Sequence, residues 1–484
     1  MTRSGIILFC IFLLALFLRL YRLPENLVFS GELGHNYLAV KNAIATQQFP
    51  LVGPPTSHPW LSFGPWFYYL VGFLFLVFGY HPIVPAYFFA VVSAGMVVLH
   101  FWVIREMRGR GVRKAMIGAL LVAFSPSFLW IAREARFYSM VVYLSYIYFL
   151  FLMRVLRGDG KSLLFLGLTV GFMLSFHYAG LILVPGTVYL LWRYGKSERI
   201  GKLGLLGGLG VVVPFMPLLI YDAMHGLPMF SKLLVWFPYR LLGALGIGHA
   251  ALPTPGSDTT IGAIIKFFGS VVGAPSGIGS AIATLAGGLV LILGVKGSLG
   301  RLGRVSAVIL GMGLGAIVIH GQPPQHYFFP LLPFVYMLYA LFLNRVFFQQ
   351  KSGRKILGFI FVMTILITQI EYLFSPQWFY LDNDQAYGWR TVPFKLQQEV
   401  TRRIVADAGG KPFSIKRVGP FDIYEQNYSQ NYRYLLWMYG NEPVENDQSG
   451  LVYTIYDEPR GLAENQDPAN TIQVANITVM KAFR

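Results

Sequence analysis

Long apolar runs, separated by short polar or basic stretches, dominate the first three quarters of the chain. A membrane-spanning helix needs roughly 20 predominantly apolar residues, and runs that fall short can extend into their flanks. The runs predicted to span are Ile6–Arg22, Pro82–Ile104, Ala115–Ile131, Phe137–Met153, Leu163–Phe176, Ala179–Trp192, Leu203–Tyr221, Ile278–Val295, Val305–His320, Phe328–Leu343 and Ile356–Phe374. The pattern therefore predicts an all-α polytopic membrane protein with about 11 transmembrane helices.

Basic residues gather in alternate loops of this predicted bundle. Twenty of the 39 Lys and Arg residues lie at Arg3 or in the loops 105–114, 154–161, 193–202, 296–304 and 345–355. Loops rich in Lys and Arg stay in the cytoplasm. We therefore expect a cytoplasmic N-terminus, and eleven spans then leave the C-terminus outside. The first run has no small-residue cleavage site after it and is predicted to be a signal anchor.

The apolar run Pro65–Phe78 is ambiguous, because a full crossing there would move every later basic loop outside. We interpret residues 25–81 as one outer loop, with an amphipathic helix over Glu32–Gln47 and a juxtamembrane or re-entrant segment over Pro65–Phe78. The alternative is a twelfth span with an undetected partner.

The composition changes after Phe374. Residues 375–484 contain 11 Lys and Arg and 13 Asp and Glu residues, and no apolar run long enough to span. Val392–Ala408 has helical spacing, and Phe413–Val418 and Leu451–Tyr456 have the character of strands. The sequence predicts two domains, a transmembrane domain over 1–374 and a small extracytoplasmic α/β domain over 375–484.

Composition supports this class and excludes others. Of 484 residues, 55% are hydrophobic and 13% are charged. This composition leaves too little polar surface to cover a string of soluble domains, and it is too apolar for a disordered chain. The net charge of +17 comes from the membrane part, which has 28 basic and 9 acidic residues. These charges fix topology and meet anionic lipid, so we expect no nucleic-acid partner. The single cysteine, Cys10, excludes an intrachain disulfide.

Candidate chemistry lies at the outer ends of the spans. Glu32, near His35 and flanked by glycines, could accept a proton from a hydroxyl, or it could simply be a helix-start charge. Arg133 and Arg136 break the charge pattern of the outer loops. Their guanidinium groups suit phosphate, and the alternative is an Arg–Glu pair at a helix end.

Further aromatic and histidine side chains lie at the same predicted membrane face. These are His58, in Ser57-His58-Pro59-Trp60, then Tyr138, His177, Tyr178, His326 and Tyr327. A lone histidine at a span end is more often structural, and Tyr at this level often belongs to the interface belt. No metal-ligating spacing and no phosphate-binding glycine loop occur, so we expect no cofactor, and nothing supports a divalent metal.

These motifs, in this order, resemble the family-39 glycosyltransferases of the C-type membrane fold, such as protein O-mannosyltransferases and bacterial aminoarabinose transferases. The resemblance rests on Leu18–Leu23 at the end of the first span, the carboxylate loop, the His58-Pro59 segment, Arg133–Tyr138, His177-Tyr178 and Tyr327–Pro330. It covers Ile6–Tyr221 well, the later spans loosely and the C-terminal domain not at all.

The resemblance implies transfer of a sugar from a polyprenyl-phosphate donor to an extracytoplasmic acceptor, with inversion, in the plasma membrane. The acceptor is a glycan, a lipid or a protein. Glu32 is then the base and Arg136, with Arg133, holds the phosphate. His58, Tyr138, His177, Tyr178, His326 and Tyr327 orient the substrates, and the lipid tail lies between spans.

This chain departs from the family at one position. The family carries an acidic pair in the first outer loop, usually Asp-Glu, and its base is commonly assigned to the Asp. Here the pair reads Gly31-Glu32. Either Glu32 substitutes as the base, or the chain is an inactive or repurposed member. A transporter or flippase of a lipid-linked glycan, and a scaffold that binds a partner through its outer domain, are the other two hypotheses.

Overall fold

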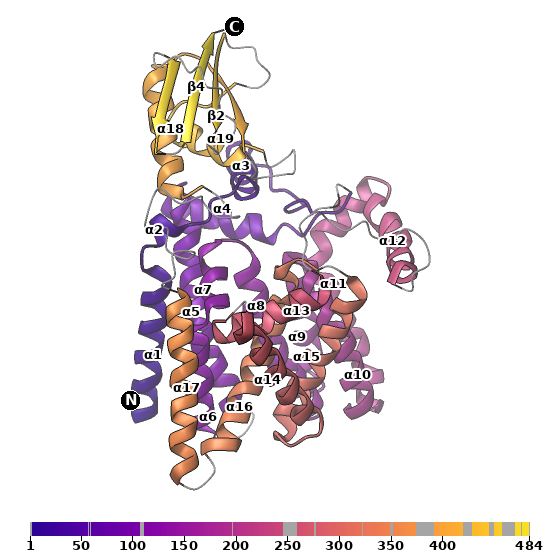
Figure 1. Ribbon diagram of the computed structural model, residues 1–484. Helices are drawn as coiled ribbons and strands as arrows, with labels where there is room; N and C mark the ends of the chain where they lie inside the picture. Colours follow the sequence, from indigo (N-terminus) through magenta and orange to yellow (C-terminus); the bar gives the residue numbers. More distant parts are fainter. Residues whose placement is uncertain are drawn as a thin grey trace.

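The computed structural model describes residues 2–56, 58, 60–106, 111–195, 197–244, 259–274, 277–321, 323–348, 352–373, 392–419, 428–444, 450–456, 470–475 and 477–483. The predicted boundary at 374/375 lies outside these residues, as do Ser57, Pro59 and Gln322. The described part is a helical bundle with a small α/β domain at one end (Figure 1).

Seven helices among the described residues are long and apolar enough to cross a membrane. Six of them are α1 (Arg3–Leu20), α5 (Ile83–Glu106), α8 (Tyr138–Leu156), α11 (Ser197–Met224), α14 (Gly277–Val295) and α15 (Gly300–His320). The seventh, Gln325–Phe348, joins η2 (Gln325–Leu331), α16 (Leu332–Leu343) and η3 (Asn344–Phe348). The prediction of a multi-pass membrane protein is therefore confirmed.

A bent pair, α6 (Val112–Phe124) and α7 (Pro126–Arg133), whose axes differ by 49°, makes an eighth span if the two helices are counted as one. Pro126 has no N–H to donate to the carbonyl four residues earlier, so the helix breaks there. The buried Arg19 of α1 donates to the Val122 and Ala123 carbonyls at 3.2 and 3.0 Å, and to Ser93 Oγ at 2.9 Å. An arginine inside the bundle thus satisfies the carbonyls that the break exposes.

Three further predicted spans appear as shorter helices. They are α9 (Ser162–Phe176), α10 (Val184–Tyr194) with the 3-10 turn η1 (Tyr178–Leu183) before it, and the apolar part, Gly358–Glu371, of the longer helix α17 (Ser352–Leu373). The total of eleven spans remains a prediction.

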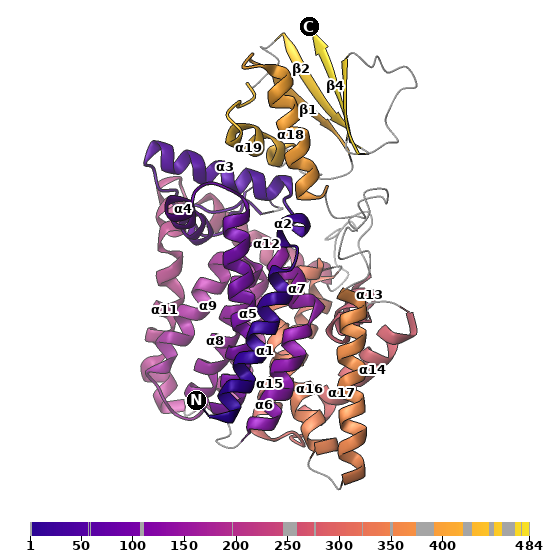
Figure 2. The same cartoon turned by 90° about the vertical axis from the view of Figure 1, so that its left-hand side faces the viewer.

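The first outer loop forms three helices at one end of the bundle, α2 (Leu23–Asn26), α3 (Gly31–Thr46) and α4 (Trp66–Phe78). With 13 residues, α4 is about 20 Å long, shorter than the roughly 30 Å hydrocarbon core of a bilayer. Both views place α3 and α4 beside the C-terminal domain (Figures 1 and 2). This arrangement fits the predicted non-crossing segment.

Two helices were not predicted, in the segment that the sequence led us to interpret as a loop between the seventh and eighth spans. They are α12 (Pro228–Ala244) and α13 (Thr260–Val272). Lys232 and Pro238 interrupt the apolar pattern of α12, and α13 is too short for a spanning window. Asp222, at the end of α11, accepts hydrogen bonds from Met229 N (2.8 Å) and Phe230 N (3.0 Å), which fixes the start of α12.

The N-terminus lies at the opposite end of the bundle (Figure 1). Arg154 pairs with Glu106 at 2.9 Å, Arg113 donates to the Phe348 carbonyl at 2.9 Å, and Arg301 donates to the Leu156 carbonyl at 2.7 Å. These bonds join four loops that the charge pattern assigned to a single side of the membrane.

The C-terminal domain packs two helices, α18 (Phe394–Ala408) and α19 (Gln430–Met438), with a four-stranded sheet of order β1-β2-β4-β3. Its strands are β1 (Ser414–Val418), β2 (Leu451–Tyr456), β3 (Thr471–Val474) and β4 (Ile477–Phe483). Strands β1 and β2 are parallel, and the other two pairs are antiparallel. The predicted small α/β domain is confirmed, although α19, β3 and β4 were not predicted.

Candidate active site

Glu32 lies in the first turn of α3, at the end of the bundle beneath the C-terminal domain. Ser30 is the N-cap residue, and its hydroxyl accepts a hydrogen bond from Leu33 N. A carboxylate in the first turn is favoured by the helix dipole. The side chain of Glu32 is 30% exposed, so it remains open to a ligand.

Arg136 reaches Glu32 from the turn between α7 and α8. Its Nη1 lies 2.9 Å from Glu32 Oε2, and its Nη2 donates to Ser30 Oγ at 2.8 Å. The side chain is 16% exposed. Burial alone would lower the pKa of Arg136, but the carboxylates of Glu32 and Glu134 outweigh burial and raise it. A cation and a carboxylate are therefore fixed together at the bundle end.

Arg133 is less accessible than Arg136. Its residue is 2% exposed, and its backbone carbonyl accepts a hydrogen bond from Val28 N at 3.2 Å. Ala135, next to Arg136, has a φ of 49°, a left-handed conformation that turns the chain between α7 and α8. Of the two candidate arginines, Arg136 is the one that an incoming anion reaches directly.

Four of the predicted side chains form one cluster of rings. Tyr138 stacks on His326 with 5.1 Å between ring centroids, and His177 meets His326 edge to face at 5.0 Å. Tyr327 lies 5.0 Å from His326 and 5.9 Å from His177. These residues come from three separate predicted turns, so the structure brings together groups up to about 190 residues apart.

His177 is uncharged in this cluster. Its Nδ1 accepts a hydrogen bond from Ala179 N at 3.0 Å, which places the ring proton on Nε2. Burial lowers the pKa of His177 to about 3. The ring therefore acts as a neutral hydrogen-bonding group rather than as a cation.

The remaining two predicted residues lie along the first outer loop. Tyr178 donates to the Ser62 carbonyl at 2.8 Å, and so holds the loop rather than facing an open site. His58 stacks on Trp60 at 5.6 Å and meets Trp236 at 5.8 Å. His58 is thus grouped with α12 and not with the histidine–tyrosine cluster.

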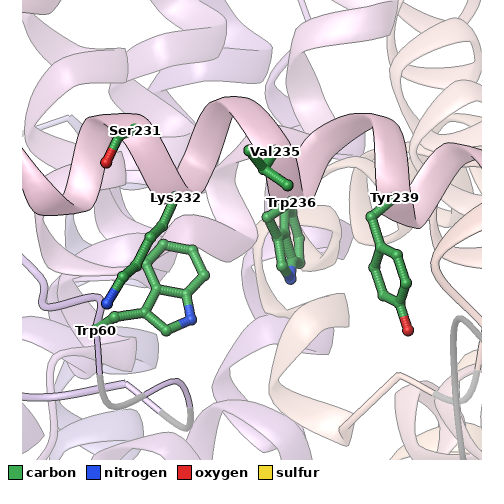
Figure 3. Close-up of a pocket in the computed structure, with 6 residues that line it drawn as sticks. All are labelled: Trp60, Ser231, Lys232, Val235, Trp236 and Tyr239. Atoms are coloured by element: carbon green, nitrogen blue, oxygen red, sulfur yellow. The ribbon is translucent and has the colours of Figure 1, made fainter.

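An open pocket of about 450 Å³ lies between this loop and α12. Its lining is Trp60, Ser231, Lys232, Val235, Trp236 and Tyr239. Figure 3 shows Lys232, Trp236 and Tyr239 on one side of α12, with Trp60 beside Lys232. Phe63 packs on His177 at 4.9 Å. Phe63 follows Trp60 by three positions, so their Cα atoms are at most about 11 Å apart and the pocket adjoins the cluster.

Sequence reasoning missed Ser30 as an Arg136 partner, although its position just before a predicted helix is a cap signal. The structure also shows why a glycine stands at position 34. A Cβ at Gly34 would lie 2.4 Å from Asn431 N, so the residue that fills this space belongs to α19 of the C-terminal domain. Within the part of the chain that the structure describes, no three His, Cys, Asp or Glu side chains converge as metal ligands.

The described residues thus form a helical bundle with an arginine–carboxylate pair and a ring cluster at one end, in keeping with the resemblance to membrane glycosyltransferases that the sequence indicated. Residues 57–221 match the family described as dolichyl-phosphate-mannose-protein mannosyltransferase. This segment contains Arg136, Tyr138 and His177. The predicted resemblance to this family is confirmed over these residues.

Solved structures extend the fold likeness to the whole chain. ArnT from Cupriavidus metallidurans in the apo state has a TM-score of 0.61 at 10% identity, covering 99% of this chain and 97% of that chain. ArnT bound to undecaprenyl phosphate has a TM-score of 0.60 at 10% identity, covering 99% and 98%. The C-type fold that the resemblance implied is therefore confirmed.

A third solved structure is more distant. The Archaeoglobus fulgidus oligosaccharyltransferase, in complex with Zn and sulfate, has a TM-score of 0.51 at 13% identity, covering 92% of this chain and 62% of that chain. Among curated proteins, none matches the sequence significantly.

Proposed function

We propose that this chain transfers a sugar from a polyprenyl-phosphate donor to a hydroxyl acceptor outside the cytoplasm, with inversion at the anomeric carbon. The observation that carries the proposal is the 2.9 Å pair of Arg136 and Glu32, held half-open beside the histidine–tyrosine cluster. Such a pair supplies the two charges that the reaction needs, one for the leaving phosphate and one for the hydroxyl proton.

Arg136 is the phosphate ligand in this proposal. In the structure, its two terminal nitrogens donate hydrogen bonds to Glu32 Oε2 and Ser30 Oγ. A donor phosphate that takes over Nη1 replaces one anion by another, while Nη2 keeps its bond to Ser30. The exchange frees Glu32 Oε2 only when the donor is bound. Donor binding thus prepares the base, which the ion pair with Arg136 otherwise neutralises.

Glu32 then accepts the proton of the acceptor hydroxyl. The acceptor oxygen attacks the anomeric carbon, and the bond from that carbon to the phosphate oxygen breaks. The electron pair passes to the phosphate, whose charge Arg136 stabilises. A single displacement of this kind inverts the anomeric centre. His177, His326, Tyr138 and Tyr327 line the sugar position with neutral rings and hydrogen-bonding groups.

The pocket beside α12 is the proposed acceptor side. Two Trp rings and one Tyr ring offer flat apolar faces, which suit the C–H faces of a sugar, and Lys232 offers a cation at the rim. The acceptor class is therefore a glycan or a glycan-bearing lipid rather than an unmodified peptide.

We further propose that the enzyme resides in the plasma membrane with its N-terminus and basic loops in the cytoplasm. The charge pattern along the sequence supports this orientation. Residues 375–484 then form an extracytoplasmic domain, on the same side as Glu32.

The test is Glu32→Gln, assayed by sugar transfer from a polyprenyl-phosphate sugar in proteoliposomes. We expect kcat to fall by at least about 100-fold, the scale of general-base catalysis. Glu106→Gln is the matched control, since Glu106 pairs with Arg154 at the same 2.9 Å distance at the other end of the bundle. Full transfer by Glu32→Gln would reject the site. Donor movement across the membrane without any transfer would favour a flippase.

A further inference from the structure

The C-terminal domain is hydrogen-bonded to the chain just before Glu32. Gln397 of α18 is fully buried, and its Nε2 donates to the Phe29 carbonyl at 2.9 Å and to the Val392 carbonyl at 2.7 Å. Its Oε1 accepts from Asn431 Nδ2 at 2.8 Å. One buried amide therefore links both helices of the C-terminal domain to the residue preceding the Ser30 cap.

The same domain also touches the chain just after Glu32. Gly34 lies so close to α19 that a Cβ would come within 2.4 Å of Asn431 N. Only glycine allows this backbone approach. Glu32 is thus bracketed, with Phe29 bonded to α18 on one side and Gly34 against α19 on the other.

Apolar and charged contacts between the C-terminal domain and α3 add to those at Phe29 and Gly34. Phe29 packs against Phe394 and Tyr434, with ring centroids 5.6 and 5.9 Å apart. Further along α3, Lys41 pairs with Glu442 at 2.8 Å and lies 4.9 Å from the centre of the Trp437 ring. These contacts run most of the length of the helix, so the C-terminal domain sets its position and not only its first turn.

We propose that the C-terminal domain is a working part of the active site, with Gln397 as a positioning residue for Glu32. By holding the Phe29 carbonyl, Gln397 sets the start of α3 and so the direction in which Ser30 and Glu32 meet Arg136. The domain completes the geometry of transfer from outside the bundle. This inference rests on the proposed function, because it takes Glu32 as the group to be positioned.

The test is Gln397→Met, which keeps the length of the side chain and removes both polar atoms. A displacement of about 1 Å at a reacting group can cost about 100-fold in rate. We expect kcat to fall by about 10- to 100-fold while the donor KM changes little. Gln473→Met is the control, because Gln473 is an exposed amide of the same domain, bonded within its own turn to the Ala475 carbonyl.

Coupling to Glu32 separates positioning from a merely structural role. In a Glu32→Gln background, we expect Gln397→Met to lower the residual rate by less than threefold, because the group it positions is gone. If the fold-losses in kcat of the two single variants multiply in the double variant instead, Gln397 acts independently of Glu32 and the inference is wrong. Wild-type kcat in a folded Gln397→Met variant would also overturn it.

Gln397→Glu covers the case in which Gln397→Met does not fold. It keeps an acceptor for Asn431 and loses the donor to the Phe29 and Val392 carbonyls, and we expect the same loss of kcat. Failure of the proposed function gives a different result, since Glu32→Gln is then fully active whatever residue 397 is. If Glu32→Gln is inactive and both Gln397 variants are fully active, only the present inference fails.

Discussion

Replacing Arg136 tests the phosphate site most directly. Arg136 makes two bonds from one guanidinium group, to Glu32 Oε2 at 2.9 Å and Ser30 Oγ at 2.8 Å. A lysine ammonium is a point charge that does not reproduce this fork. Arg136→Lys therefore keeps the charge and loses one of the two bonds, whichever anion occupies the other.

The magnitude follows from the bonds lost. A hydrogen bond that involves a charged group contributes about 1.5–3 kcal/mol, which is about 10- to 150-fold in kcat/KM at 1.4 kcal/mol per factor of ten. Arg136→Gln also removes the charge that stabilises the leaving phosphate. For loss of one such electrostatic group we expect about 100- to 1000-fold in kcat.

The assay follows transfer of a labelled sugar from its polyprenyl phosphate in proteoliposomes, with the donor concentration varied. Arg154→Gln is the control, since it breaks an ion pair of the same length at the opposite end of the bundle. We expect this control to stay within about twofold of the wild type, because exposed pairs contribute little. Arg136→Gln with a kcat/KM near that of the wild type would refute the reasoning.

Three further predictions concern the bundle, the ring cluster and the pocket. Arg19→Leu removes the guanidinium donor to the Val122 and Ala123 carbonyls and leaves Val122 its 3.3 Å bond from Ser125 N, so the thermal midpoint falls, with partial recovery in Arg19→Lys; an unchanged midpoint for Arg19→Leu would contradict this. Burial lowers the pKa of His177 to about 3, so His177 binds a proton more weakly in the folded protein than in the unfolded chain. As the pH drops below about 6.5, protonation therefore favours the unfolded chain and the protein loses stability. In His177→Gln the loss of midpoint between pH 7 and pH 5 should be smaller, and an identical loss would argue against a buried neutral ring. Trp60→Ala should raise the acceptor KM several-fold and leave kcat unchanged, whereas an unchanged KM would place the acceptor elsewhere.

The residues at each end of the bundle could be predicted from the sequence, because Lys and Arg are frequent in cytoplasmic loops and rare in outer loops. Arg133 and Arg136 stood out as basic residues in a loop that should have few, and the structure places Arg136 at the site. The break in the third span was not predicted, although Pro126 within the run Ala115–Ile131 is a sequence signal for one. The partner that repairs the break, Arg19, lies 103 residues from Val122 and was not predictable.

Contacts between distant segments were beyond the sequence for a general reason. Arg136 and Glu32 are 104 residues apart, and Gln397 and Phe29 are 368 apart. No periodicity or spacing rule connects residues at such separations, because packing of the whole fold decides which turns meet. The sequence thus indicated which residues reach the outer face, whereas only the fold showed that Glu32 meets Arg136 and that His58 does not join the ring cluster.

The missing aspartate at position 31 offers a decisive test of whether Glu32 has taken over the role of base. Gly31 lies at the start of α3, where an acidic residue is favoured by the helix dipole, and its φ is not in the left-handed region. Gly31→Asp therefore restores the acidic pair without backbone strain, and it places the new carboxylate at a buried position. If Glu32 is the base in this chain, the double variant Gly31→Asp, Glu32→Gln should recover at least about tenfold of the transfer rate that Glu32→Gln loses. Recovery would show that position 31 or 32 can supply the proton acceptor, with Arg136 as its common partner. A double variant as slow as Glu32→Gln, with the same thermal midpoint, would instead tie the chemistry to the longer reach of the glutamate. High activity in both Glu32→Gln and the double variant would remove the carboxylate from the mechanism altogether.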